Sequence, residues 1–319
     1  MTPYIVYGGP SSENEVSCAS KDLFLELLKA HNPILVEWKK DMSFVVQGET
    51  LELEALLVYL KEHNGTFINA MHGEFCEDGW IQGYLEKAGI PFTGPSSESA
   101  KQSMDKIKSQ DIVKDIIDTI PTESITLTGA DGENEEFVQK VISFNWNYPL
   151  FIKPNAKGSS VGVYKVNNEE ELIKTANELV PDTYLIQPGI EGTEVSIGTV
   201  CDNGEFLDLP ATEILPKGDF FDYKSKYTEG GSNEITPARV SKEVMDKLKE
   251  VSIEIHKRLD LGCYSRTDII IGKDNKMYYL ETNSLPGMSK MSLLPQQLRA
   301  IGKLEEFGEI LLRNINQSN

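Results

Sequence analysis

The chain has 319 residues, with 31 Lys and Arg against 50 Asp and Glu, so its formal charge is −19. A hydrophobic content of 39% and a charged content of 25% are ordinary for globular proteins and argue against disorder. The acidity argues against a protein that binds nucleic acid or anionic lipid through bulk positive charge. At roughly 100–200 residues per domain, we expect two or three domains.

Neither a membrane span nor a secretion signal is predicted. The chain has no apolar run of about 18 residues, and its first residues lack the basic start and long apolar stretch of a signal peptide. Four cysteines are scattered without a CxxC pair: Cys18, Cys76, Cys201 and Cys263. Their spacing argues against a disulfide framework and a structural zinc and suits a reducing compartment, so we expect a cytoplasmic protein.

The first third of the chain alternates between strand and helix patterns. Ser12 with Glu15 fits a capping box at the start of the first helix, which continues through Leu27 and Leu28. Beyond that helix, the expected elements are strands over 4–7, 34–38 and 66–71, helices over 51–63 and 79–88, and an edge strand over 90–93. This alternation predicts a parallel α/β domain over residues 1–94.

The next section, over residues 95–186, is expected to form an α+β domain. A polar stretch of small residues over 96–103 precedes helical spacing over 104–117. Two expected strands, over 149–153 and 161–166, flank a segment whose Gly158 predicts a flexible flap. A helix capped by Asn167 or Asn168 and a strand over 184–187 complete the pattern.

The last section, over residues 187–319, is richer in hairpins and is expected to form a third domain. Asp202-Asn203-Gly204 lies between apolar runs and predicts a tight hairpin. A long amphipathic helix is expected over 241–259 and stops at Gly262. A second hairpin is expected to pair 264–271 with 277–282 around Lys273-Asp274-Asn275.

The clearest cluster of reactive side chains lies on that second hairpin. Arg266 and Asp268 are two residues apart and share one face of a strand, and Glu281 and Asn283 do the same on the next strand. If the strands pair, Asp268, Glu281 and Asn283 converge as oxygen donors, which suit Mg²⁺. The alternative is a solvated hairpin face. Carboxylates within apolar strands are costly unless they are paired or bound to metal, so we favour the metal site.

Other motifs are weaker when each is taken alone. Lys153 ends an apolar strand before Gly158-Ser159-Ser160-Val161-Gly162, whose backbone N–H groups could surround phosphate oxygens, although most Gly-Ser turns are only turns. A histidine at a strand end, such as His72, is more often structural than catalytic. Phe221-Asp222-Tyr223 is more typical of packing, and Ser12-Glu13 is more typical of a helix cap.

Taken in order, these stretches resemble the D-alanine–D-alanine ligase family of ATP-grasp enzymes over nearly the whole chain. The matching stretches are Gly8 to Ser17, His72-Gly73, Glu77-Asp78-Gly79, Gln82-Gly83, Pro91 to Gly94, Met104-Asp105-Lys106, Lys153-Pro154, Gly158 to Gly162, Phe221-Asp222-Tyr223, Lys226-Tyr227, Arg266-Thr267-Asp268, and Glu281 to Met288 with Ser292. The resemblance implies a three-domain ATP-grasp fold, α/β and α+β in class. Its parts would be an N-terminal parallel α/β substrate domain (1–94), a central lid domain (95–186) and a catalytic domain (187–319).

The resemblance also implies a role for each matched side chain. ATP would lie between the last two domains, in contact with Lys106, Lys153, Ser160, Gln187, Ile190 and Glu194. Magnesium, or manganese in its place, would bind as two ions to Asp268, Glu281 and Asn283. Glu13 would pair with the ammonium of the first amino acid, with His72 close by, while Ser159 and Tyr227 orient its carboxylate. Arg266 and the backbone N–H of Gly287 would stabilise the oxyanion, and Lys226 and Ser292 would receive the second carboxylate.

The implied reaction transfers a phosphoryl group from ATP to the carboxylate of one D-alanine, whose acyl phosphate is attacked by the amine of a second, for peptidoglycan precursor synthesis. The implied assembly is a homodimer with neither nucleic acid nor membrane as partner. Two departures bear on nucleotide affinity: Lys157 stands where family members often carry an acidic residue, and Gln187-Pro188 replaces a common Glu-Lys pair.

Three alternatives stay open: an ATP-grasp ligase for other amino acids, a D-alanine–D-lactate ligase, and a non-catalytic sensor of nucleotide or amino acid. The substrate residues Glu13, Tyr227, Lys226 and Ser292 favour D-alanine. A sensor is expected to have lost a metal carboxylate or Arg266, and this sequence keeps them.

Overall fold

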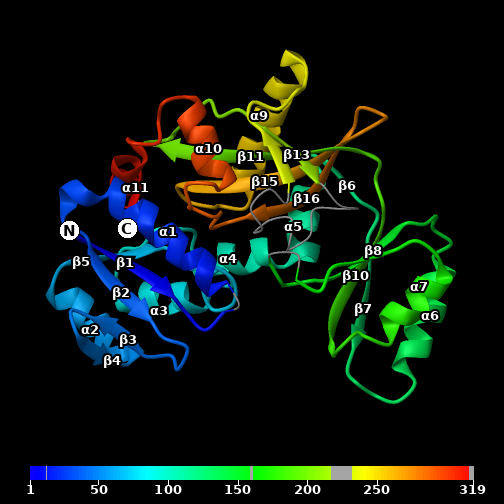
Figure 1. Cartoon of the computed structure of the whole chain (residues 1–319), viewed down its shortest axis with the longest axis horizontal. Coiled ribbons are helices and arrows are strands. Elements are labelled where there is room, and N and C mark those ends of the chain that lie inside the picture. Colours follow the sequence, from blue (N-terminus) through cyan, green and yellow to red (C-terminus); the bar gives the residue numbers. More distant parts are fainter. Residues whose placement is uncertain (12, 159–160, 217–231, 316–319) are drawn as a thin grey trace.

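The structure is a computed structural model that describes residues 1–11, 13–158, 161–216 and 232–315. In this part of the chain there are three β-sheets, which follow one another in sequence except that the short strand β6 (Asp118–Thr119) belongs to the third, and helices pack against each of them (Figure 1). The first sheet lies beside the third, and the second stands apart at the right of the view (Figure 1). None of the helices in these residues is long and apolar enough to span a membrane.

The first sheet has a parallel centre. Strand β1 (Thr2–Gly8) lies between β2 (Ile34–Trp38) and β5 (Gly65–Asn69) and pairs in parallel with both, while β3 (Phe44–Val46) and β4 (Glu49–Leu51) add an antiparallel edge. Side chains alternate along β1, so Tyr4 and Val6 pack with α2 (Leu53–Glu62) and α3 (Trp80–Ala88), and Ile5 packs with α1 (Asn14–Leu27). The loops that follow β1 and β5 leave the same edge of the sheet and carry Glu13 and His72.

The second sheet is antiparallel, in the order β7-β10-β8-β9. Two helices cover it with apolar side chains such as Phe137 and Leu172, and Asn168 caps the second of them by accepting a hydrogen bond from the backbone N–H of Glu171. The elements are β7 (Glu123–Leu127), α6 (Glu133–Ser143), β8 (Leu150–Pro154), β9 (Tyr164–Val166), α7 (Glu169–Ala176) and β10 (Asp182–Pro188).

The third sheet holds the long hairpin that carries the predicted metal ligands. Its order is β14-β13-β11-β15-β16-β6, and β12 (Glu205–Phe206) pairs with the end of β11. The strands are β6 (Asp118–Thr119), β11 (Gly192–Asp202), β13 (Thr212–Pro216), β14 (Ser232–Ile235), β15 (Tyr264–Gly272) and β16 (Met277–Asn283). The helices are α4 (Ser97–Met104), α5 (Lys106–Val113), α9 (Lys242–Arg258), α10 (Leu293–Ala300) and α11 (Phe307–Ile315).

One hydrophobic core joins the first and third sheets. Ile5 of β1 and Phe24 of α1 lie in the same cluster as Val200 of β11, Tyr264 of β15 and Phe307 of α11. Helices α4 and α5 contact β16, and β6 pairs with it in parallel, so the chain just after residue 94 is also attached to the third sheet. The domain limits at 94/95 and 186/187 remain predictions.

The structure adds to or differs from some local expectations. The polar stretch over 96–103 forms helix α4, which buries Ser99, Ala100 and Ser103, and small residues of this kind leave no apolar periodicity to detect. The first helix begins at Asn14 with Glu13 as its N-cap, and the Glu13 side chain makes no cap hydrogen bond. Ser12, where the capping box is expected, lies outside the described residues. The edge strand expected over 90–93 is a single bridge between Phe92 and Phe67.

Candidate active site

The hairpin of β15 and β16 brings together the four side chains predicted from their spacing. Asp268 is the register partner of Glu281, and Arg266 is the partner of Asn283. The register shifts between Asp268 and Ile269, directly after the first of these pairs. Two strands with polar residues at alternate positions therefore present both carboxylates and the amide on one face.

The Asp268 carboxylate is buried and fully hydrogen-bonded. Arg266 donates from Nε to Oδ1 and from Nη2 to Oδ2, both at 3.0 Å. Ser196 on β11 donates to Oδ1 at 2.5 Å, and the Asn283 amide donates to Oδ2 at 3.2 Å. The bidentate guanidinium compensates the charge of a carboxylate that is 8% exposed, which makes this burial tolerable. Sequence patterns did not identify Ser196, which lies 72 residues away.

Lys106 connects the predicted metal site to the flap. Its Nζ lies 3.4 Å from Oε2 of Glu281 and donates to the carbonyl oxygen of Lys157 at 2.7 Å. The lysine is buried at the start of α5. Its position is fixed by Asn155, whose carbonyl and side-chain oxygens accept from the backbone N–H groups of Lys106 and Ile107.

The N-cap of α5 supports the same arrangement. The Asp105 carboxylate accepts hydrogen bonds from the backbone N–H of Lys108 and from the Asn155 amide. Burial raises the pKa of Asp105, but these hydrogen bonds outweigh it and leave the pKa below its ordinary value. An ionised cap at a helix N-terminus is favourable, so it helps to hold Lys106 at the site.

A cavity of about 410 Å³ lies between the second and third sheets. Among its lining residues are all the described side chains predicted to contact ATP, together with two predicted metal ligands: Lys106, Lys153, Gln187, Ile190, Glu194, Asp268 and Glu281. Phe151, Leu215 and Ile270 add apolar surface, which suits a planar base. The side-chain NH₂ group of Gln187 donates a hydrogen bond to the Thr122 hydroxyl at 2.7 Å, and this bond fixes the orientation of the Gln187 amide.

Lys157 lines the same cavity and forms an ion pair. Its Nζ lies 3.0 Å from Oδ2 of Asp182, and this hydrogen bond raises the pKa of the lysine above its ordinary value. The departure from the family pattern at this position therefore places a charged lysine beside the flap, and Asp182 at the start of β10 balances its charge.

A second cavity, of about 310 Å³, adjoins the first along the same polar face of the hairpin. Its lining holds the described residues predicted to bind amino acids, with Arg266 and Asn283 at the hairpin wall: Glu13, His72, Arg266, Asn283, Gly287 and Ser292. Gly287 packs closely against Ser292, because a Cβ at Gly287 would lie 2.9 Å from Oγ of Ser292 and would have to displace it. The Ser292 hydroxyl also accepts a hydrogen bond from the backbone N–H of Ser289 at 3.0 Å.

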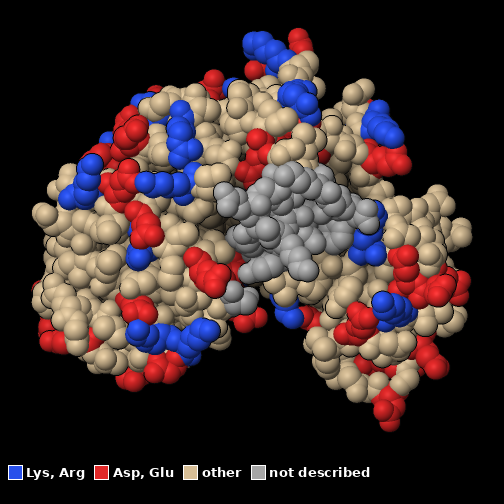
Figure 2. Space-filling view, in the orientation of Figure 1, with Lys and Arg blue, Asp and Glu red and all other residues tan. Residues whose placement is uncertain are grey.

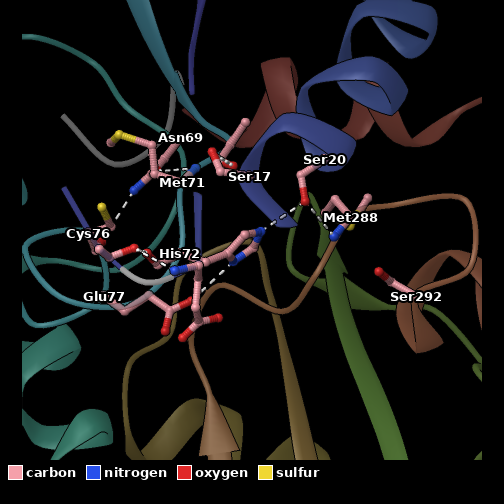
Figure 3. Close-up of polar contacts among 12 residues, drawn as sticks. Ser17, Ser20, Asn69, Met71, His72, Cys76, Glu77, Met288 and Ser292 are labelled. Carbon is pink, nitrogen blue, oxygen red and sulfur yellow. Dashed lines mark hydrogen bonds and ion pairs between the residues drawn. The ribbon is translucent and has the colours of Figure 1, made fainter. Parts of the chain in front are cut away.

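His72 is the centre of a buried polar network (Figure 3). Its Nδ1 faces Oε1 of Glu77 at 3.2 Å, its Nε2 lies 2.8 Å from Oγ of Ser20, and its carbonyl accepts from the Ser11 hydroxyl. Burial raises the pKa of Glu77 above its ordinary value, the hydrogen bond with His72 opposes this, and the nearby Glu13 carboxylate adds to it. The histidine is therefore part of the second cavity and is not an isolated residue at a strand end.

Four predicted site residues lie outside the described part of the chain: Ser159, Ser160, Lys226 and Tyr227. The Phe221-Asp222-Tyr223 motif lies there as well. The flap residue Gly158 is described, and a Cβ built on it would lie 3.3 Å from Oε1 of Glu13. The base of the flap thus meets the amino-acid cavity.

The oxygens of Asp268, Glu281 and Asn283 fit a hard divalent cation, provided that the Asn283 amide turns its oxygen toward the site. Over residues 1–11, 13–158, 161–216 and 232–315, no three His, Cys, Asp or Glu side chains gather into a metal site. The predicted set therefore relies on the Asn283 amide as its third donor beside two carboxylates. This amide points its NH₂ toward Asp268, and rotation by half a turn would present its oxygen instead.

Acidic side chains are spread widely over the face of the molecule in Figure 2, where Lys and Arg are interspersed among them. The cations at the two cavities are therefore local features placed by α5, β8 and β15, and do not belong to a broad basic surface on this face.

Comparison with known proteins identifies the family. A family model described as D-ala D-ala ligase C-terminus matches residues 113–312. A D-alanine–D-alanine ligase of Leptospira interrogans serovar Lai is 37% identical over 308 residues, which cover 94% of this chain and 82% of the relative. One from Halalkalibacterium halodurans is 32% identical over 303 residues, 93% of each chain.

The structural comparison agrees. The crystal structure of VanG D-Ala:D-Ser ligase from Enterococcus faecalis has a TM-score of 0.80 at 25% identity and is matched over 98% of this chain and 99% of its own. The predicted fold class, α/β and α+β with a three-part ATP-grasp architecture, is confirmed. By its sequence and its fold, the chain belongs to the D-alanine–D-alanine ligase family.

Proposed function

We propose that this chain joins two D-alanine molecules into D-alanyl-D-alanine and converts ATP to ADP and phosphate. The observation that supports this best is the pair of adjoining cavities along the polar face of the β15–β16 hairpin. One cavity holds lysines and apolar surface suited to a nucleotide, the other holds carboxylates and an arginine suited to amino acids, and Asp268 and Arg266 adjoin at the shared wall. The choice of D-alanine as substrate is supported by the relatives named D-alanine–D-alanine ligase, which align with more than nine-tenths of this chain.

On the nucleotide side, the adenine would lie along Gln187 and Ile190, and Glu194 would bind the ribose. Lys106 and Lys153 would contact the phosphates, with Ser160 of the flap above them. Lys106 also holds the Lys157 carbonyl, so one ammonium group would link closure of the flap to the position of the phosphates. In this arrangement the γ-phosphate would lie toward the hairpin and the second cavity.

On the amino-acid side, Glu13 would pair with the ammonium of the first D-alanine beside His72, and Ser159 and Tyr227 would orient its carboxylate. A carboxylate oxygen attacks the γ-phosphorus of ATP and ADP leaves. The amine nitrogen of the second D-alanine then attacks the carbonyl carbon of the acyl phosphate, and collapse of the tetrahedral adduct expels phosphate.

Charge develops on the carbonyl oxygen during that attack. The Arg266 guanidinium and the Gly287 backbone N–H would stabilise it, because donors already in place need little reorganisation. Ser292 and Lys226 would receive the carboxylate of the second D-alanine. Closure of the flap would exclude water, which otherwise hydrolyses the acyl phosphate.

Asp268, Glu281 and Asn283 would hold Mg²⁺, as two ions, or Mn²⁺ in its place. When bound, the metal supplies positive charge that neutralises the phosphate oxygens. Arg266 orients Asp268 through two hydrogen bonds, and Lys106 lies against Glu281, so both carboxylates are held before any ligand binds.

The test is direct. The purified chain is incubated with ATP, Mg²⁺ and one acceptor at a time: D-alanine, L-alanine, D-serine, or D-alanine with D-lactate. We expect ADP, phosphate and D-alanyl-D-alanine, identified by mass spectrometry, with D-alanine the best substrate near neutral pH. Phosphate release without dipeptide, or a predominant product with D-lactate, would contradict the proposal. We further propose a homodimer that supplies peptidoglycan precursor synthesis, and light scattering would measure the mass of the assembly.

A further inference from the structure

One buried hydroxyl joins the two halves of the amino-acid cavity. Ser20 lies on the inner face of α1 and is 0% exposed. Its oxygen accepts a hydrogen bond from the backbone N–H of Met288 at 3.2 Å and lies 2.8 Å from Nε2 of His72 (Figure 3). These two partners are 268 and 52 residues away in the sequence, so the serine links α1 to the loop after β16 and to the loop after β5.

The Glu77 carboxylate sets the direction of this network. A carboxylate only accepts hydrogen bonds, so the ring proton of a neutral His72 lies on Nδ1, 3.2 Å from Glu77. Nε2 then accepts the hydrogen of the Ser20 hydroxyl, whose oxygen accepts from the Met288 N–H. Each donor along the chain of bonds points the same way, from Met288 to Ser20, His72 and Glu77, and bonds in such a chain reinforce one another.

The Met288 contact also orders the predicted oxyanion donor. Its N–H belongs to the peptide that follows Gly287, a residue with no side chain to restrict its backbone. Met288 is 1% exposed, so without Ser20 its N–H would be buried and would lose this partner, which is costly enough to shift the loop.

We propose that Ser20 is a positioning residue that fixes the Gly287 N–H relative to the His72 side of the first amino-acid site. The inference rests on the proposed ligase reaction, because it assigns Ser20 to the step in which charge develops beside Gly287. Ser20 itself touches neither substrate nor metal in this assignment and acts through Met288 and His72.

Ser17 provides a matched control on the same helix. It is also 0% exposed, and its hydroxyl accepts from the Gly8 N–H at 2.8 Å and donates to the Ala70 carbonyl at 2.9 Å. Both of its partners belong to the first sheet and its loops, so Ser17→Ala removes a comparable buried hydroxyl without loosening the loop after β16.

The experiment compares Ser20→Ala, Ser20→Cys and Ser17→Ala with the wild type in the ligation assay and in thermal unfolding. We expect both alanine variants to lose similar thermal stability. Ser20→Ala should lower kcat about tenfold, less than the loss expected from removing an oxyanion donor itself, with a smaller change in KM for D-alanine. Ser20→Cys keeps nearly the same volume with a weaker donor and acceptor, so its kcat should also fall, and Ser17→Ala should stay within about twofold of the wild type.

Histidine ring spectra supply a readout that does not depend on turnover. The chain has four histidines, so nitrogen-15 labelling of histidine gives a spectrum in which His72 can be assigned with a His72→Asn variant. We expect Ser20→Ala to shift the His72 Nε2 resonance and Ser17→Ala to leave it in place. An unchanged resonance in Ser20→Ala, or equal kcat in the two alanine variants, overturns the inference. A wild type that is inactive with D-alanine refutes the proposed function instead, and the spectra still test the network.

Discussion

Replacing Glu281 by Gln should strongly reduce turnover while changing the free energy of unfolding only slightly. The substitution keeps the shape of the side chain and removes one negative charge from the predicted metal site. Glu281 lies 3.4 Å from the Lys106 ammonium, which corresponds to a gross attraction of about 5 kcal/mol at an effective dielectric constant near 20. Its side chain is 26% exposed, and solvent and side-chain entropy reduce the net contribution of such a pair to about 1 kcal/mol.

The effect on the reaction should be much larger than the effect on folding. A divalent ion contributes several kcal/mol of charge stabilisation, so losing a charged ligand is expected to cost about 4 kcal/mol, or roughly a thousandfold in kcat. The melting temperature should fall by only about 2 °C. We therefore expect a folded variant with almost no turnover and with a higher magnesium requirement.

The assay follows ADP release over a magnesium titration, with thermal unfolding measured on the same samples. Glu213→Gln is the control, because Glu213 lines the same cavity and pairs with Arg239 but belongs to no predicted metal set. It should lose some stability and keep the wild-type magnesium dependence. Near-normal kcat with an unchanged magnesium dependence in Glu281→Gln would refute the metal assignment.

Three further changes test other parts of the structure. Arg266→Lys cannot keep both hydrogen bonds to Asp268, so kcat should fall about 100-fold while KM for ATP changes little; equal kcat would contradict the role of the guanidinium. Burial lowers the pKa of His256 from 6.5 to about 4, so the unfolded chain binds a proton at this histidine before the folded protein does. The free energy of unfolding should therefore fall by about 3 kcal/mol as the pH falls from 6.5 to 4. Urea unfolding of His256→Gln should show a smaller loss. Lys157→Met removes the charge paired with Asp182 and should raise KM for ATP several-fold with a stability change below about 1 kcal/mol, and an unchanged KM would show that the lysine does not contribute to nucleotide binding.

The sequence predicted those features that depend on local spacing. Arg266 and Asp268, and Glu281 and Asn283, are each two residues apart, so strand periodicity alone put them on one face, and the structure pairs them in register. A cap for α7 was expected at Asn167 or Asn168, and the structure shows that it is Asn168. The roles of the site residues stay predictions, because geometry places side chains and does not show what they bind.

Features that depend on distant contacts could not be predicted. Ser196 and Ser20 look like ordinary buried serines in the sequence, and their partners lie 72 and 268 residues away. The contact of Lys106 with the Lys157 carbonyl spans 51 residues and involves a backbone group that carries no sequence signal. Helix α4 was not predicted because its buried face consists of small residues, two serines and an alanine, which show neither hydrophobic periodicity nor an apolar run.

The polar face of the β15–β16 hairpin forms one wall shared by two adjoining chambers, and this constrains how the protein can change. Arg266 faces the amino-acid chamber while bonded to Asp268, which faces the nucleotide chamber, so a substitution in this wall alters the place where the two ligands meet. New amino-acid preferences are therefore easier to reach from the outer rim of the second chamber, at Met291 or Glu234, where the nucleotide chamber is left intact.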